Sequence, residues 1–322
     1  MPSSLPSPEP TASAASASAV ARLVRGLRGL PPAEQWWGEG CAGMAGWFRA
    51  ESAPTTDATA RYRELYAEVR KGRPVLPMEA RRHVYLLVKG LLGEELFGYL
   101  EGNQQRLERR GLETREVQVD TEASLAANIE VVRNALEDAA FFGRSVVLVG
   151  HSKGAVESLA ALSMYPQLRR VVRAVVSIQA PYGGSPIAHD VMASPELRRV
   201  MDIAVPLLFY GVSKSIDDLS YPQRMEFVRR YPYPVEIPTV SLATWRDSKR
   251  SMLWPVARYM RERYGLANDG LVAAVDAEIP GSRVVRLDDM DHAEAAMAGL
   301  PGLANYRPGD ITEAAVALAL ES

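Results

Sequence analysis

Six short strand-like runs, separated by segments with helical spacing, constrain the fold of this 322-residue chain more than any other feature. The run SVVLV at 145–149 is almost wholly apolar, as is typical of a strand buried on both faces of a sheet. The other runs lie at 83–89, 114–119, 172–180, 235–244 and 282–287. Helical spacing follows at 94–110, 122–141, 153–165 and in the last residues, ITEAAVALALES. This alternation predicts an α/β fold with a mostly parallel, doubly wound sheet.

Two regions depart from the alternation. Residues 1–20 are rich in Ser, Ala and Pro, and we expect them to form a disordered tail. Residues 21–75 are expected to form an N-terminal helical extension, which leaves 76–322 as the main domain. Within that domain, residues 185–234 look mostly helical, with the apolar stretch AVPLLFYGV in the middle. We expect an insertion there that either caps the site or packs as ordinary structure.

Composition excludes several classes of protein. A net charge of −2 gives no electrostatic footprint for nucleic-acid binding. Cys41 is the one cysteine, so the chain has no internal disulfide, which fits a reducing compartment. The sequence shows neither a secretory signal peptide nor an apolar run long enough to span a membrane. We therefore expect a cytoplasmic protein, with a non-standard export route as the alternative.

The run at 145–149 leads directly into the turn GHSKG, with Ser152 at its centre, and then into a helical segment. A nucleophile elbow needs this order, because its turn is so tight that the flanking residues must be small. The helix that starts beneath the serine also helps to stabilise negative charge. The alternative is a plain strand-to-helix turn without chemistry. The strand before the turn and the helix after it favour Ser152 as a nucleophile.

A serine nucleophile needs a base, and the base needs a carboxylate that orients it. In this type of fold the acid and then the histidine follow the serine along the chain. His292 lies in a loop after the last strand, where such a base must sit, whereas His189 lies inside the insertion and is expected to be partly exposed. Asp269 precedes the last strand and is the favoured acid. The remaining candidates for the acid are Asp247, Asp276, Asp288, Asp289 and Asp291.

Two backbone N–H groups should stabilise the oxyanion that develops during acyl transfer. One is expected from Lys153, the residue after the nucleophile. The other is expected from Leu91 in KGLLG, where Gly90 lets the chain turn after the first strand. The alternative for KGLLG is an ordinary strand-ending turn. The side chain of Lys153 is expected to face solvent at the start of a helix, without a role of its own.

Four motifs in this order make residues 83 to 300 resemble α/β-hydrolase lipases and esterases of the bacterial triacylglycerol lipase type. They are LLVKGLLG, GHSKG, QAPYGGSPIAHD, and NDGLV followed by a DH pair. The resemblance implies a catalytic triad of Ser152, Asp269 and His292, with Leu91 and Lys153 forming the oxyanion hole. Two positions depart from the family pattern, since lipases often have histidine where this chain has Lys89 and Tyr182.

The resemblance also implies a function. It implies a serine hydrolase that cleaves carboxylic esters, of lipids or of other acyl groups, through an acyl-enzyme on Ser152. No metal or organic cofactor is expected, and no nucleic-acid partner. Transient contact with a lipid surface through the cap is expected. Two alternatives stay open: a thioesterase or acyltransferase with the same triad, and a non-catalytic binding protein on the same scaffold.

Overall fold

The computed structural model describes residues 41, 43–195, 198–199, 213–251, 253–298 and 306–321. The strands of these residues form one seven-stranded sheet in the order β1-β7-β6-β5-β4-β2-β3, and every pair of neighbours is parallel. The strands are β1 (Thr56–Asp57), β2 (His83–Val88), β3 (Glu113–Glu116), β4 (Ser145–His151), β5 (Val172–Ile178), β6 (Thr239–Trp245) and β7 (Arg283–Asp288). The predicted α/β fold with a parallel, doubly wound sheet is confirmed.

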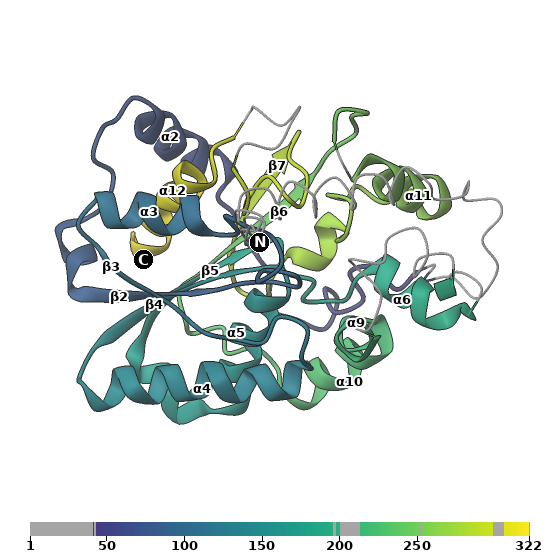
Figure 1. Cartoon of the computed structure of the whole chain (residues 1–322), viewed down its shortest axis with the longest axis horizontal. Coiled ribbons are helices and arrows are strands. Elements are labelled where there is room, and N and C mark those ends of the chain that lie inside the picture. The colour runs from purple at the N-terminus through teal and green to yellow at the C-terminus, as the bar shows by residue number, and fades with distance from the viewer. Residues whose placement is uncertain are drawn as a thin grey trace, which may run out of the picture.

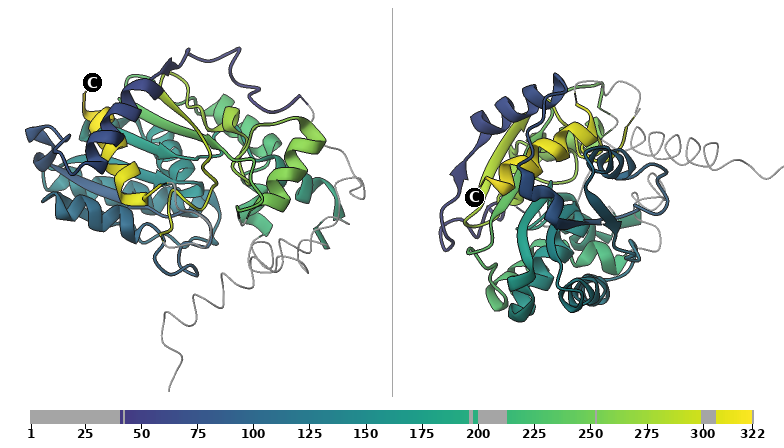
Figure 2. Two further views of the ribbon diagram at one scale, coloured as in Figure 1. Left: turned by 90° about the horizontal axis from the view of Figure 1, so that it is seen from above. Right: turned by 90° about the vertical axis from the view of Figure 1, so that its left-hand side faces the viewer.

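Helices cover both faces of the sheet (Figure 1). One face carries α4 (Leu125–Phe141) and α5 (Lys153–Met164), and the other carries α2 (Thr59–Arg70), α3 (Glu101–Arg109) and α12 (Pro308–Leu320). In Figure 2, α12 in yellow lies beside α2 in purple. Short 3₁₀ segments are η2 (Met78–Arg82), η3 (Pro166–Val171) and η4 (Ala274–Ala277). None of the helices in the described residues is long and apolar enough to cross a bilayer.

Four further helices gather at one end of the molecule, on the right of Figure 1. They are α6 (Pro186–Ala193), α9 (Ser213–Asp217), α10 (Tyr221–Arg230) and α11 (Trp254–Tyr264). The first three belong to the predicted insertion at 185–234, whose apolar stretch AVPLLFYGV lies outside the described residues, as does the predicted tail at 1–20. Of the predicted extension, β1 pairs with β7 and α2 contacts α12, so these two elements join the main sheet and its helical layer.

Several predicted elements have different bounds in the structure, and three of them show why. The helix predicted at 94–110 begins only at Glu101, because residues 91–100 form turns in which Leu92 and Leu100 have φ of 61° and 58°. A positive φ is incompatible with a right-handed helix. The strand predicted at 114–119 spans Glu113–Glu116 at the sheet edge. The strand predicted at 235–244 begins at Thr239, after Pro238, which has no N–H to donate to the ladder.

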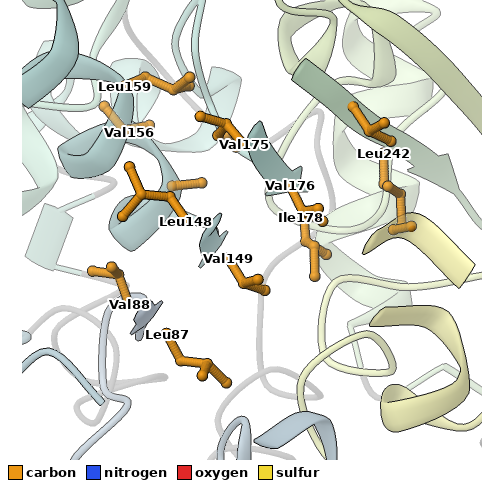
Figure 3. Close-up of a cluster of buried hydrophobic side chains, with 14 of the residues drawn as sticks. Leu87, Val88, Leu148, Val149, Val156, Leu159, Val175, Val176, Ile178 and Leu242 are labelled. Atoms are coloured by element: carbon orange, nitrogen blue, oxygen red, sulfur yellow. The ribbon is translucent and has the colours of Figure 1, made fainter. Parts of the chain in front are cut away.

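One part of the core lies between the central strands and α5, and α12 packs into the same core from the other face of the sheet. Figure 3 shows apolar side chains of β2, β4, β5 and β6 beside Val156 and Leu159 of α5. Leu148 and Val176 have no exposed surface, and burial of one such side chain contributes about 1.5–3 kcal/mol. Because β4 and α5 are both packed into this core, the turn that joins them is held from its two sides.

Candidate active site

Ser152 occupies a strained turn between β4 and α5. Its backbone has φ 55° and ψ −127°, a region that costs a non-glycine residue about 1–3 kcal/mol. Three hydrogen bonds hold it there: its N–H donates to the carbonyl of Ile178 at 2.9 Å, and its carbonyl accepts from Ala155 and Val156 at 3.1 and 3.2 Å. Strain of this kind persists only where the surrounding structure enforces it, and it is concentrated at functional sites.

The glycines around Ser152 leave no room for a side chain. A Cβ atom on Gly150 would lie 2.5 Å from the Cα of Ala155, and one on Gly154 would lie 2.2 Å from the carbonyl oxygen of Lys89. A Cβ on Gly90 would lie 2.8 Å from the Cβ of Ser152. The small residues that the elbow requires are therefore in place, and the loop that follows β2 lies directly against the serine.

His292 and Asp269 meet at the same end of the sheet. Nδ1 of His292 lies 2.8 Å from Oδ2 of Asp269, and the His292 backbone N–H donates to the Asp269 carbonyl at 2.9 Å. The other carboxylate oxygen of Asp269 accepts from the N–H groups of Leu271 and Val272 at 3.0 and 2.8 Å. The side chains of His292 and Asp269 are 6% and 2% exposed. Asp269 thus holds the imidazole by Nδ1 and leaves Nε2 for other partners.

Ser152 and His292 line one cavity of about 100 Å³. Leu91 lines it too, and no Asp, Glu, Lys or Arg is among its described lining residues. Much of the remaining wall is apolar, with Leu92, Leu96, Ile187, Ile216, Leu253 and Met297. The cavity suits a neutral, apolar group held next to the serine.

The backbone N–H groups of Leu91 and Lys153 lie on the two segments that border Ser152. Leu91 follows Gly90, which abuts the serine, and Lys153 follows the serine directly. No acceptor in the described part of the chain takes either N–H. The N–H of Lys153 lies in the first turn of α5 and that of Leu91 lies in a loop, so neither has a partner within a helix or strand and both are available to a ligand.

The other candidate acids have different partners. Asp291 accepts from the hydroxyl of Ser251 at 2.7 Å, and Asp276 accepts from Tyr221 at 2.6 Å and from the N–H of Gly46 at 2.8 Å. Asp247, Asp288 and Asp289 form ion pairs with Arg261, Arg63 and Arg246. Among the described acids, only Asp269 bonds the ring of His292.

His189 was expected to be partly exposed, and that expectation is wrong. It lies in α6 and is 8% exposed, with its ring 5.8 Å from that of Tyr221. Because α10 and α11 both contact α6, they cover this helix, which local sequence spacing does not reveal.

The expectation that the Lys153 side chain faces solvent is also wrong. This side chain is 1% exposed, and its Nζ lies 2.6 Å from Oε1 of Glu157, which is itself 0% exposed. Burial raises the pKa of Glu157 to about 7, although Lys153 and Asn128 oppose the shift. A signal was present in the sequence: a helix as apolar as GAVESLAAL is buried on all sides, so a charged residue within it needs a buried partner.

A buried network that no sequence pattern indicates lies next to the site. Nδ1 of His151 is hydrogen-bonded to the hydroxyl of Tyr99, and its Nε2 lies 2.9 Å from Oε1 of Gln179 and 3.1 Å from the carbonyl of His292. Gln179, at φ 52°, also donates to the carbonyl of Asp291 at 3.0 Å. Burial lowers the pKa of His151 to about 3, so the ring is neutral. Together these side chains hold the loop that carries His292.

The described residues contain no group of three or more His, Cys, Asp or Glu arranged to hold a metal ion.

Solved structures similar to this chain include a carboxyl esterase and a lipase. A metagenomic carboxyl esterase is 24% identical with a TM-score of 0.68, over 90% of this chain and 98% of that one. A lipase from Bacillus licheniformis in its mature form is 22% identical with a TM-score of 0.55, over 69% and 89%. EstA from Clostridium botulinum is 13% identical with a TM-score of 0.51, over 85% and 96%. No protein-family model and no curated protein matches the chain. With the all-parallel sheet, these likenesses show an α/β-hydrolase fold.

Proposed function

We propose that this chain of α/β-hydrolase fold is a carboxylic ester hydrolase with Ser152 as its nucleophile. One observation carries the proposal: Ser152, on its strained turn, lines the same apolar cavity as His292, and the Nδ1 of that histidine is already bonded to Asp269. A serine, a base and an orienting carboxylate in this arrangement are what nucleophilic acyl transfer needs.

The reaction would proceed in two halves. Nε2 of His292 takes the hydroxyl proton of Ser152 while Oγ attacks the ester carbonyl carbon. The resulting oxyanion accepts hydrogen bonds from the N–H groups of Leu91 and Lys153. The tetrahedral intermediate collapses, His292 gives its proton to the leaving alkoxide, and an acyl-enzyme remains. Water, deprotonated by His292, then adds to the acyl carbon, and His292 returns that proton to Oγ of Ser152 as the bond to the acyl group breaks and the acid leaves. Asp269 keeps the proton of the neutral ring on Nδ1 throughout.

The walls of the cavity favour an apolar acyl group. A charged group would lose its hydration without gaining a charged partner among the described lining residues. Two of the similar solved structures are a carboxyl esterase and a lipase, which supports ester substrates. Contact with a lipid surface through α6, α9 and α10 would follow if the natural ester is a lipid.

The test compares the wild type with Ser152→Ala on p-nitrophenyl esters of increasing chain length. We expect the variant to fall to the uncatalysed background, because removing the nucleophile leaves almost no turnover. A fluorophosphonate probe should add its phosphonyl group to the wild type, with loss of fluoride, and leave the variant unmodified in the intact mass. Equal turnover in the two proteins would refute the proposal. Parallel assays on acyl thioesters decide between an esterase and a thioesterase.

A further inference from the structure

We infer that a chain of polar contacts, buried where it begins at Lys153 and exposed where it ends at Glu94, joins the two donors of the proposed oxyanion hole and fixes their relative position. The inference rests on the function proposed above. The chain of contacts starts at the side chain of Lys153, passes through Glu157 and Asn128, and ends at Glu94 on the loop that carries Leu91. We refer to these contacts as the polar relay.

The first contact fixes the residue that follows the nucleophile. The ammonium of Lys153 lies 2.6 Å from Oε1 of Glu157, one helical turn further along α5. The two side chains are 1% and 0% exposed, so water solvates neither of them and each depends on the other as its partner. The backbone N–H proposed as an oxyanion donor belongs to this same lysine, and the ion pair therefore restrains it.

The second contact leaves α5 for the neighbouring helix. The side-chain amide of Asn128, in α4, donates to Oε1 of Glu157 at 2.7 Å and to the carbonyl of Asp120 at 2.7 Å. Asn128 is 1% exposed, and one amide nitrogen thus bridges the elbow helix and the segment after β3. Because both acceptors share this nitrogen, a shift of α5 that moves Glu157 also displaces Asn128 relative to the carbonyl of Asp120.

The third contact reaches the other donor. Thr121, next to Asp120, donates its N–H to Oε2 of Glu94 at 3.1 Å, and its hydroxyl lies 3.4 Å from the same oxygen. Glu94 stands three residues after Leu91 in the loop that abuts Ser152. The segment at Asp120 and Thr121 is therefore tied both to the first residue of α5 and to the loop of Leu91.

The Lys153–Glu157 pair is better explained by the position it gives to the donors than by a contribution to the stability of the fold. A buried ion pair is often replaced by apolar side chains without loss of stability, so stability alone does not explain Lys153 and Glu157. An oxyanion hole acts only when its donors lie about 2.7–3.1 Å from the oxygen that becomes charged. A small shift of either donor therefore reduces the stabilisation of the transition state, and with it kcat, and leaves substrate binding nearly unchanged.

The first experiment removes the buried pair as a unit, in Lys153→Met/Glu157→Leu. Changing both residues avoids leaving one buried charge without its partner. We expect the melting temperature to stay within a few degrees of the wild type, kcat to fall about 10–100-fold and KM to change less than about threefold. Deleting one donor outright costs about 10²–10³ in kcat, so displacing it should cost less. A kcat within twofold of the wild type would overturn the inference.

The second experiment works at the exposed end of the relay, where folding is not at risk. Glu94→Ala removes the acceptor of Thr121, and Glu95→Ala is its matched control, because the neighbouring Glu95 is also exposed and no described residue bonds its side chain. We expect kcat to fall about 3–10-fold in the first variant and to be unchanged in the second. Equal kcat values for the two variants would contradict the relay.

Ser152→Ala, assayed in the same series, distinguishes the two possible failures. Suppose that it abolishes turnover while Lys153→Met/Glu157→Leu and Glu94→Ala keep the wild-type kcat. The relay is then refuted, and the proposed function stands. Full turnover in Ser152→Ala instead refutes the proposed function, and the positioning role falls with it.

Discussion

Gly154→Ala sets two physical effects against each other in the second residue of α5. Helix propensity favours alanine over glycine by up to about 1 kcal/mol. The new Cβ, however, would lie 2.2 Å from the carbonyl oxygen of Lys89 and 2.4 Å from that of Val88. Carbon contacts are optimal near 3.5–4.0 Å, and both atoms belong to the backbone at the end of β2, so no side chain can yield. Strand and helix must separate by about 1 Å or more.

The steric effect should win. Overpacking of a well-packed site costs about 1–3 kcal/mol, which leaves a net destabilisation of up to about 2 kcal/mol once about 1 kcal/mol of helix propensity is subtracted. For a chain of this size that lowers the melting temperature by up to roughly 4 °C. The displaced end of β2 leads into the loop of Leu91, and we therefore expect kcat for a p-nitrophenyl ester to fall at least about tenfold.

Gly102→Ala is the matched control, because Gly102 is likewise the second residue of its helix, α3. A Cβ there would meet only Ala298 at 3.9 Å and Pro308 at 4.0 Å, which are ordinary van der Waals contacts. We expect its melting temperature to be unchanged or slightly higher and its kcat to equal that of the wild type. Thermal unfolding and steady-state kinetics on the three proteins test the argument. If both glycine variants behave alike, the steric reasoning is refuted.

Two further predictions concern carboxylates. In Asp269→Asn the new amide would donate to Nδ1 of His292 and favour the tautomer that cannot accept the serine proton. We therefore expect kcat to fall about 10⁴-fold with KM little changed. A loss under tenfold in steady-state kinetics would argue against Asp269 as the orienting acid. Burial raises the pKa of Asp276 to about 7, above its unfolded value near 3.8. Its contribution to stability is complete below about pH 4 and is lost as the pH rises to about 7. Asp276→Asn should therefore flatten the fall in melting temperature between pH 5 and pH 8, and an unchanged slope would contradict the shift.

Much of the fold could be predicted because its signals are local. Runs such as SVVLV are apolar on both faces, and only a parallel sheet covered by helices buries such strands completely. Element ends were less predictable. Glu101 starts its helix late because the preceding loop turns back against Ser152, with positive φ at Leu92 and Leu100. That conformation depends on contacts with a distant part of the chain, so the helical spacing of residues 94–100 could not predict it.

The elbow itself was readable from sequence, since the glycines at 150 and 154 are needed by any turn this tight. His292 and Asp269 were candidates from their order along the chain and their places after strands. Their direct contact, at 2.8 Å, depends on how the loops after β6 and β7 fold over one another. Which of Asp269 and Asp291 contacts the ring of His292 likewise depends on that folding, because Asp291 bonds Ser251 instead.

The sequence by itself thus determined the layered fold and the sharp turn at Ser152, because strand periodicity and glycine sterics act over a few residues. The tertiary structure alone decided the environment of the charged and polar groups near that turn. Lys153 is buried because α4 and the segment after β3 close over the start of α5 and bring Asn128 to its partner Glu157. Whether a charge lies in water or in a low-dielectric interior depends on segments far away in the chain, and a local pattern contains no information about them.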